Sequence, residues 1–363
     1  VPHKRLLNKL KFYGVNNNLL SWIESFLIGR QQHVAINGNV SSPADVASGI
    51  PQGTVLGPLL FLIFINDLPS AVESTCKLYA DDAKVWVNFS MEDQTALQTS
   101  LQEDLDRLNT WSNTWLMHFN ITKCKVLHLG LNNPRATYRM RGIPLEKTDL
   151  EKDLGIHIDP SLNFHGHVSA VSSKANSLLY LLRRNFSFTD PTTFPPIFKA
   201  IVRSHLEYGI PAWHPTTRYD VKALEKIQRR ATKFIPSLRD LPYPERLRSL
   251  KLPTLSYRRL RGMMIQCYKF AHNLQNCSFL SFDYQTPRGH PYQLRKHRTR
   301  TTHCQNFFSF STVNPWNSLP YSVVSAPSII SFESRLDKHW KDHPLLYDPD
   351  STISHPHHLN FPH

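Results

Sequence analysis

Apolar residues recur at helical spacing early in the chain and again around residue 100. This pattern predicts helices over residues 3–12, 18–28, 54–68 and 92–119, the third of which should end at Pro69. Residues 31–37 and 44–48, on either side of Asn37-Gly38, have the pattern of a hairpin. Residues 77–89 predict a second, tighter hairpin that has Asp81 and Asp82 at its middle.

Two further strands are predicted over residues 125–129 and 154–158. The resulting β-α-β-β-α-β order is typical of the α+β class, with a split βαβ antiparallel sheet backed by helices. Beyond residue 160 the pattern becomes helical, and residues 283–302 form a basic loop. The helices are expected over residues 164–186, 193–207, 219–235 and 255–274, and a frayed tail over 341–363.

The charge of the chain is divided unevenly. The 363 residues carry 42 Lys and Arg against 28 Asp and Glu, a net charge of +14. Residues 1–160 have a net charge of −1, so the whole excess lies in residues 161–363, at +15. A basic half of this size indicates a polyanionic partner, either nucleic acid or an anionic membrane surface.

Two other classes of protein fit poorly. The longest apolar run, Val55–Ile65, is too short to span a bilayer, which favours nucleic acid over a membrane as the partner. The five cysteines are widely spaced and contain no C-x-x-C pair. We therefore expect free thiols in a reducing compartment rather than a disulfide framework or a structural zinc site.

Tyr79-Ala80-Asp81-Asp82 is the first candidate for chemistry, because apolar residues flank two adjacent carboxylates. Successive residues of a strand point to opposite faces, so both carboxylates can face one side only at a turn. A carboxylate pair at a hairpin tip suits a divalent cation, although Asp-Asp in a turn is more often simply solvated. Upstream, Gly49 and Gly53 punctuate a loop that opens an apolar helix and carries Gln52.

Together these residues resemble the reverse transcriptases of non-LTR (LINE-type, jockey-like) retrotransposons. Four stretches carry the resemblance: S-G-I-P-Q-G-T-V-L-G-P-L-L-F at 48–61 resembles motif B, Y-A-D-D at 79–82 motif C, F-N-I-T-K-C-K at 119–125 motif D, and D-L-G-I-H-I-D at 153–159 motif E. Residues 205–209, 224–233 and 315–320 resemble the region that follows the polymerase in these elements. Four motifs in order make the resemblance specific.

The resemblance implies a right-hand polymerase palm with part of the fingers over residues 1–160, a helical thumb over 161–280 and a basic C-terminal region with a disordered tail over 281–363. It further implies that an RNA template is copied into DNA by extension of a DNA primer with deoxynucleotide triphosphates. The reaction would be a two-metal nucleotidyl transfer that uses Mg²⁺ or Mn²⁺. Asp81 and Asp82 would ligate the metals. Pro51, Gln52 and Gly53 would position the nucleotide, and Leu154 and Gly155 would form the primer grip. Lys123 would be the general acid, with Lys125 an alternative, because both would share one face of a strand.

The family's first catalytic aspartate lies in a D-F-x-K-A-F-D-like segment, of which Val1-Pro2-His3 resembles only the end. We therefore expect an N-terminally truncated chain without useful polymerase activity of its own, since neither Asp45 nor Asp67 is an evident substitute. One alternative is a remnant or co-opted fragment that only binds nucleic acid. Another is a relative of intron maturases or telomerase, against which the long match beyond residue 161 argues.

The basic half offers its own candidates. Lys222, Lys226, Arg229 and Lys233 form a cationic stripe opposite an apolar one, with no acid along it, and we expect them to bind nucleic-acid phosphates. Arg258, Arg259 and Arg261 form a second cluster. Residues 295–300 form a third, which could touch template RNA or serve as a nuclear address. As a retrotransposon ribonucleoprotein, the protein would occupy nucleus and cytoplasm.

Overall fold

A computed structural model describes residues 1–89, 94–130, 132–186, 190–215, 217–282, 289–299 and 302–351. The chain divides into two compact units, Val1–Asp149 and Leu150–His363, each with its own core. No helix in the described ranges is long and apolar enough to cross a bilayer. The structure mixes helices and strands, as the α+β prediction requires.

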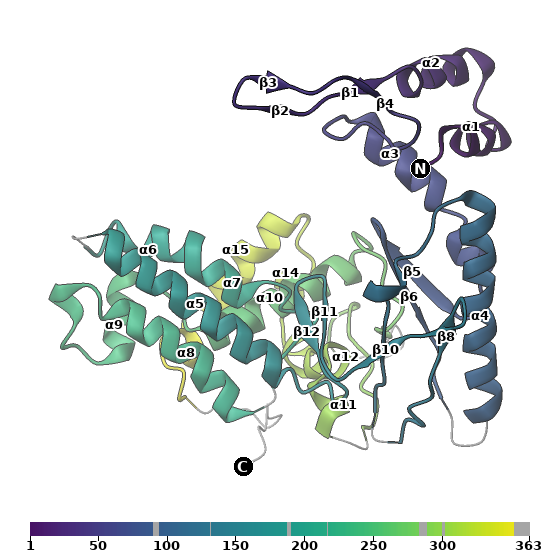
Figure 1. Ribbon diagram of the computed structural model, residues 1–363. Helices are drawn as coiled ribbons and strands as arrows, with labels where there is room; N and C mark the ends of the chain where they lie inside the picture. The colour runs from purple at the N-terminus through teal and green to yellow at the C-terminus, as the bar shows by residue number, and fades with distance from the viewer. Residues whose placement is uncertain are drawn as a thin grey trace. The chain divides into compact units, whose positions relative to one another are not determined.

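The first unit combines four α-helices with short hairpins (Figure 1). Its helices are α1 (His3–Phe12), α2 (Asn17–Leu27), α3 (Leu56–Ile65) and α4 (Gln94–Trp115), with 3₁₀ turns η1 (Leu68–Ala71) and η2 (Ile121–Lys123). Its strands are β1 (Gln31–Gln32), β2 (Ala35–Ile36), β3 (Asn39–Val40), β4 (Ala44–Asp45), β5 (Thr75–Tyr79), β6 (Asp82–Trp86), β7 (Lys125–Leu127), β8 (Arg139–Met140), β9 (Ile143–Pro144) and β10 (Glu146–Thr148).

The predicted helices of this unit are confirmed, with two changes at their ends. The apolar helix ends at Ile65, and Pro69 lies inside η1, where the first turn of a helix tolerates its missing N–H. The long helix ends at Trp115, because Leu116 adopts a φ of +53°. Residues 92 and 93, where that helix was expected to start, lie outside the described residues.

The predicted antiparallel sheet is wrong for the described residues. Their strands form six separate two-stranded pairs, and β7 pairs with β10 in parallel. The two hairpins are confirmed: β1 pairs with β4 and β2 with β3 around Asn37-Gly38, and β5 pairs with β6. The apolar strand residues Cys76, Leu78 and Val126 belong to the same hydrophobic cluster as residues of α3 and α4, so they pack against helices rather than within a broad sheet.

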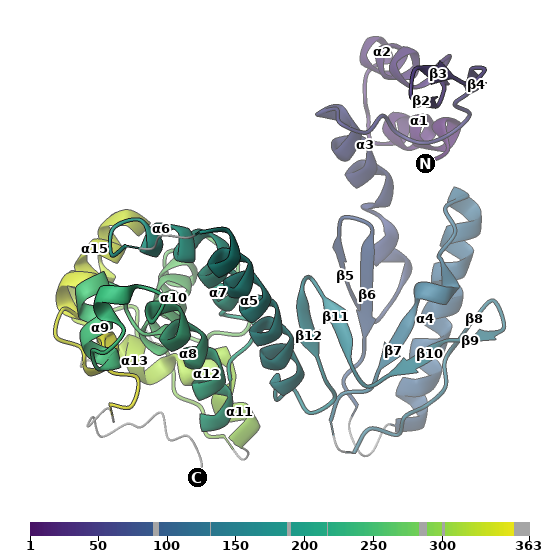
Figure 2. The same cartoon turned by 60° about the vertical axis from the view of Figure 1, so that its left-hand side comes forward.

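The second unit is mostly helical (Figure 2). It opens with the hairpin β11 (Glu151–Asp153) and β12 (Ile156–Ile158). Its helices are α5 (His165–Asn185), α6 (Phe194–Phe198), α7 (Ser204–Glu207), α8 (Arg218–Thr232), α9 (Tyr243–Leu250), α10 (Leu255–Ala271), α11 (Thr302–Asn306), α12 (Phe308–Ser311), α13 (Val313–Asn317), α14 (Tyr321–Val324) and α15 (Ile329–His339), with a π-helical segment η3 (Lys199–Arg203) and 3₁₀ turns η4 (Pro236–Leu238) and η5 (Pro344–Leu346).

Two hydrophobic cores hold this unit together. The second core includes residues beyond 341, where a frayed tail was expected. Helices α5 to α9 enclose the first core, whereas α10 shares the second with α13, α14 and α15. The second core thus contains residues from both sides of residue 280. The tail expected from residue 341 is wrong up to η5, because Leu345 is buried and Thr254 bonds the carbonyls of Leu345 and Leu346. Residues 352–363 lie outside the described part.

Candidate functional site

The hairpin β5–β6 carries both candidate metal ligands. Tyr79 pairs directly with Asp82, so Ala80 and Asp81 make a two-residue turn. Ala80 adopts a φ of +52°, a region that favours glycine and costs another residue about 1 kcal/mol or more. The strained turn places Asp81 at the tip and Asp82 at the first position of β6, and both are exposed.

This donor set suits a hard cation but is incomplete by itself. Two exposed carboxylates offer the oxygen ligands that Mg²⁺ prefers. In the described part of the chain, however, no group of three or more His, Cys, Asp or Glu side chains is arranged to hold a metal. Asp81 and Asp82 therefore supply part of a cation site and do not by themselves make a two-metal centre.

The loop before α3 is held in shape by its glycines and by the start of the chain. Gly49 and Gly53 have φ angles of +96° and +77°, which only glycine adopts without strain. The Gly49 carbonyl accepts hydrogen bonds from His3 Nε2 (2.8 Å) and from an Arg30 guanidinium nitrogen (3.1 Å). Gln52 and Gly53 are exposed and Pro51 is half-buried, so the loop offers a fixed backbone and a solvent-facing amide.

Asp45 and Asp67, the two acids considered as substitutes for the family's first catalytic aspartate, both have hydrogen-bond partners within the fold. Asp67 accepts from Lys9 Nζ (2.5 Å) and Trp111 Nε1 (3.2 Å), and Asp45 accepts from Gln31 Nε2 (3.0 Å). Lys9 is only 3% exposed, and its ammonium lies 3.8 Å from the centre of the Trp115 ring. Burial lowers the Lys9 pKa, whereas the bond to Asp67 opposes that shift. The only sign of this buried cation in the sequence is its place on the apolar face of α1, beside Leu6 and Leu10.

Asp104 is another acid that sequence reasoning missed. It is fully buried and accepts from the backbone N–H groups of Glu73 and Ser74 and from Arg107. Burial raises the pKa of this carboxyl, but the hydrogen bonds outweigh it and the net pKa is lowered. Asp104 thereby fixes the segment before β5, and so the base of the hairpin that carries Asp81.

The two candidate general acids occupy different backbone settings. Lys123 lies in the 3₁₀ turn η2, whereas Lys125 is the first residue of β7. The prediction that both share one face of a strand is therefore wrong. Both side chains are exposed.

The expected primer grip lies in the second unit. Leu154 and Gly155 form the turn of β11–β12, with φ angles of +44° and +86°. The Tyr208 hydroxyl donates to the Leu154 carbonyl (3.0 Å), and a Cβ on Gly155 would lie 3.2 Å from the Tyr208 ring. The turn therefore packs closely against the Tyr208 ring, and this contact together with the positive φ favours glycine over a larger residue at position 155.

The cationic stripe on α8 is exposed as predicted. Lys222, Lys226, Arg229 and Lys233 all face solvent, while Leu224, Ile227 and Ala231 are buried on the opposite side. One expectation is wrong: Asp350 lies 3.6 Å from Arg229, so an acid does reach the stripe. The stripe also extends to Arg230, which is exposed and bonds Asn176 of α5.

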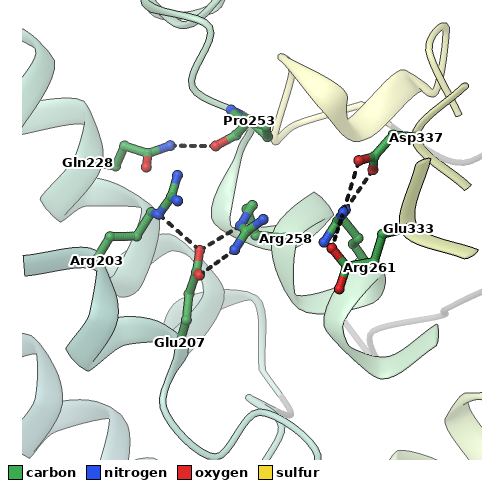
Figure 3. A network of polar contacts seen from close by, with 8 residues as sticks. All are labelled: Arg203, Glu207, Gln228, Pro253, Arg258, Arg261, Glu333 and Asp337. Atoms are coloured by element: carbon green, nitrogen blue, oxygen red, sulfur yellow. Dashed lines mark hydrogen bonds and ion pairs between the residues drawn. The ribbon is translucent and has the colours of Figure 1, made fainter. Parts of the chain in front are cut away.

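Two arginines of the cluster on α10, Arg258 and Arg261, are paired with carboxylates within the fold (Figure 3). Arg258 makes two hydrogen bonds to Glu207 (2.9 and 2.7 Å), and Arg261 pairs with Glu333 and Asp337. Arg259 is 3% exposed, lies 4.9 Å from the Trp213 ring centre, and has its pKa lowered by burial to about 10. Arg258 and Arg261 are therefore paired with acids from distant segments, and Arg259 is buried against Trp213.

The third basic cluster remains at the surface. Arg295, Lys296 and Arg298 are exposed, next to the buried Leu294. Asn317 holds this segment by bonding both the N–H and the carbonyl of Leu294. Arg300 lies outside the described residues.

Comparison with known proteins gives the same family that the motifs suggested. The reverse transcriptase (RNA-dependent DNA polymerase) family model matches residues 1–175. The RNA-directed DNA polymerase from mobile element jockey of Drosophila funebris is 30% identical over 267 residues, which cover 69% of this chain and 28% of the relative. The probable RNA-directed DNA polymerase from transposon BS of Drosophila melanogaster is 28% identical over 265 residues, which cover 67% and 28%.

The jockey polymerase of Drosophila melanogaster is also similar, at 28% identity over 252 residues, 64% of this chain and 27% of the relative. The chain thus spans about a quarter of the length of these curated relatives. Residues 1–175 belong to the reverse transcriptase (RNA-dependent DNA polymerase) family, and the chain as a whole is similar to the RNA-directed DNA polymerases of LINE-type retrotransposons.

Proposed function

We propose that this chain takes part in RNA-directed DNA synthesis, with residues 1–160 as part of the fingers and palm and residues 161–280 as a helical thumb. The observation that carries the proposal is the β5–β6 turn, which exposes Asp81 and Asp82 together in a domain that matches reverse transcriptases. Divalent cations bound there would lower the pKa of a primer hydroxyl and offset charge on pyrophosphate.

Each residue set has its own part in this proposal. The carboxylates of Asp81 and Asp82 would bind cations, and the fixed loop at Pro51–Gly53 would hold the incoming nucleotide. Lys123, exposed on η2, would give a proton to the leaving group, and the Leu154-Gly155 turn would hold the primer end. The α8 stripe would contact phosphates of the RNA template and DNA primer.

Manganese binding tests the proposal at its centre. Titration of the 363-residue chain with Mn²⁺, followed by the electron paramagnetic resonance signal of free Mn²⁺, should show weak binding that Asp81→Asn and Asp82→Asn abolish. Asp106→Asn is the matched control, because Asp106 is an exposed carboxylate on α4 whose sequence neighbours, Leu105 and Arg107, are not acids. Equal binding by the Asp81 variant and the control would contradict the assignment.

A non-enzymatic role is the second candidate, favoured by the lack of a three-ligand group in the described residues. Under it, residues 1–363 bind RNA but do not extend a primer in the presence of Mg²⁺ and deoxynucleotides. Detectable extension by this chain alone would exclude that role and our expectation of inactivity. We also propose a location in nucleus and cytoplasm, supported by the exposed cations at 295–298.

A further inference from the structure

Helices α5 and α8 lie side by side and run parallel, which makes one continuous surface out of two segments (Figure 1 and Figure 2). Three contacts fix this register. His165 Nδ1 lies 2.7 Å from Asp220 Oδ1, Arg230 donates to Asn176 Oδ1 (2.6 Å), and the Arg183 guanidinium lies 5.7 Å from the Phe234 ring centre. Both helices therefore begin at the same end and stay in contact over most of their length.

The surface of this pair is cationic, because its acids are absent or buried. Helix α5 contains no Asp or Glu at all. Helix α8 contains Asp220 and Glu225, which are only 1% and 4% exposed. The exposed charged residues of the two helices are all positive: Lys174, Arg183, Arg184, Arg218, Lys222, Lys226, Arg229 and Arg230.

Two exposed tyrosines lie among these cations. Tyr219 is 72% exposed and precedes Lys222, Lys226 and Arg230 by three, seven and eleven positions, so all four share one side of α8. Tyr180 is 69% exposed and follows Asn176, the partner of Arg230, by one helical turn. We call the surface of Tyr180, Tyr219, Lys222, Lys226 and Arg230 the α5–α8 face.

Tyr219 is also held in a defined aromatic pair. Its ring centre lies 5.8 Å from that of His165, which is itself bonded to the buried Asp220. The bond orients the imidazole, and the two rings form a platform where the helices begin. Tyr180 lies fifteen residues after His165 along α5, or about 22 Å away along the helix axis.

We infer that the α5–α8 face binds single-stranded nucleic acid, with its cations on the phosphates and Tyr219 and Tyr180 stacked on unpaired bases. This inference deepens the proposed function and rests on it for the phosphate contacts. Cations contact the phosphates of a single strand and of a duplex alike. Exposed aromatic rings distinguish a single strand from a duplex. Only unpaired bases offer their flat faces to a ring, whereas the bases of a duplex are already stacked on one another. In RNA-directed synthesis, the strand with unpaired bases is the template that has not yet been copied.

A binding experiment separates this inference from the proposed function. Fluorescence anisotropy would compare a mixed-sequence single-stranded RNA with the same RNA annealed to complementary DNA, using the 363-residue chain. The variants are the double substitution Tyr180→Ala with Tyr219→Ala, its ring-retaining counterpart with Phe at both positions, and Tyr321→Ala. Tyr321 is the matched control because it is 59% exposed on α14, in the other core of this unit.

The wild-type chain should prefer the single strand, and the double alanine variant should lose about fivefold or more in affinity for it. Its affinity for the hybrid duplex should be unchanged, and the Phe and Tyr321 variants should match wild type. Equal losses for both nucleic acids, or no loss with alanine, would overturn the inference. In either case, weakening of both complexes by Lys222→Glu and Lys226→Glu would leave the proposed phosphate contacts standing.

Discussion

Helices α8 and α10 of the second unit are both rich in basic residues, yet the environments of their cations differ. On α8, Lys222, Lys226 and Arg229 face solvent. On α10, Arg258 and Arg261 pair with carboxylates that lie 51 and 76 residues away in the chain (Figure 3). The difference teaches that a basic helix can be judged as a nucleic-acid surface only after its long-range acids have been located.

The largest expected effect tests the α8 side of this comparison. Reversing all four charges, by Lys222→Glu, Lys226→Glu, Arg229→Glu and Lys233→Glu, should lower affinity for single-stranded RNA by about a hundredfold at low salt. The dependence of log K on log salt should flatten by about 3, because each phosphate contact contributes about 0.7. Anisotropy titrations over a salt series measure both. Unchanged affinity would show that this helix faces solvent without a polyanionic partner.

The next effect tests the α10 side. Arg258→Ala should lower the free energy of unfolding by about 2 kcal/mol, because Glu207 loses two charge-assisted hydrogen bonds in a largely buried place. Urea unfolding followed by circular dichroism measures the loss. The matched variant Lys226→Ala should change stability by less than about 0.5 kcal/mol, since its side chain is exposed. Similar losses in the two variants would break the comparison.

A pH effect sharpens the contrast between the two faces of α8. Glu225 is buried opposite the cationic stripe; burial raises its pKa, although Tyr243 and the Leu255 N–H donate to it. Its stabilising contribution is therefore fully present below about pH 4.3 and falls as pH rises through the raised folded-state pKa. Relative to Glu225→Gln, wild-type stability should fall as pH rises toward neutral. A difference that stays constant across urea titrations at several pH values would count against this.

The smallest effect concerns the acid that reaches the stripe. Asp350→Asn should raise RNA affinity about twofold, because Asp350 lies near Arg229 and partly offsets its charge. Stability should change by less than about 0.5 kcal/mol, since both side chains are about half exposed or more. Anisotropy and urea unfolding measure the two quantities. A loss of affinity would mean that Asp350 supports the binding face instead of opposing it.

Local features of the candidate site were predictable. Asn37-Gly38 and Ala80-Asp81 each join two paired strands where a hairpin was predicted, and the ends of α1, α2 and α5 fall within a residue or two of the predicted ones. Turn chemistry and helical periodicity act over a few residues, so the sequence carries them directly. The predicted antiparallel sheet was wrong because strand partners are chosen over long distances, as the parallel pairing of β7 with β10 illustrates.

By itself, the sequence determined the reverse transcriptase motifs, the exposed carboxylates at a hairpin tip and the concentration of positive charge beyond residue 160. Tertiary structure decided which charges remain available. It buried Arg259 against Trp213, paired Arg258 and Arg261 with distant acids, and joined Arg230 of α8 to Asn176 of α5, one helical turn from Tyr180. The reason is physical: periodicity fixes which side of a helix is apolar, whereas the neighbour that packs against its polar side depends on the path of the whole chain.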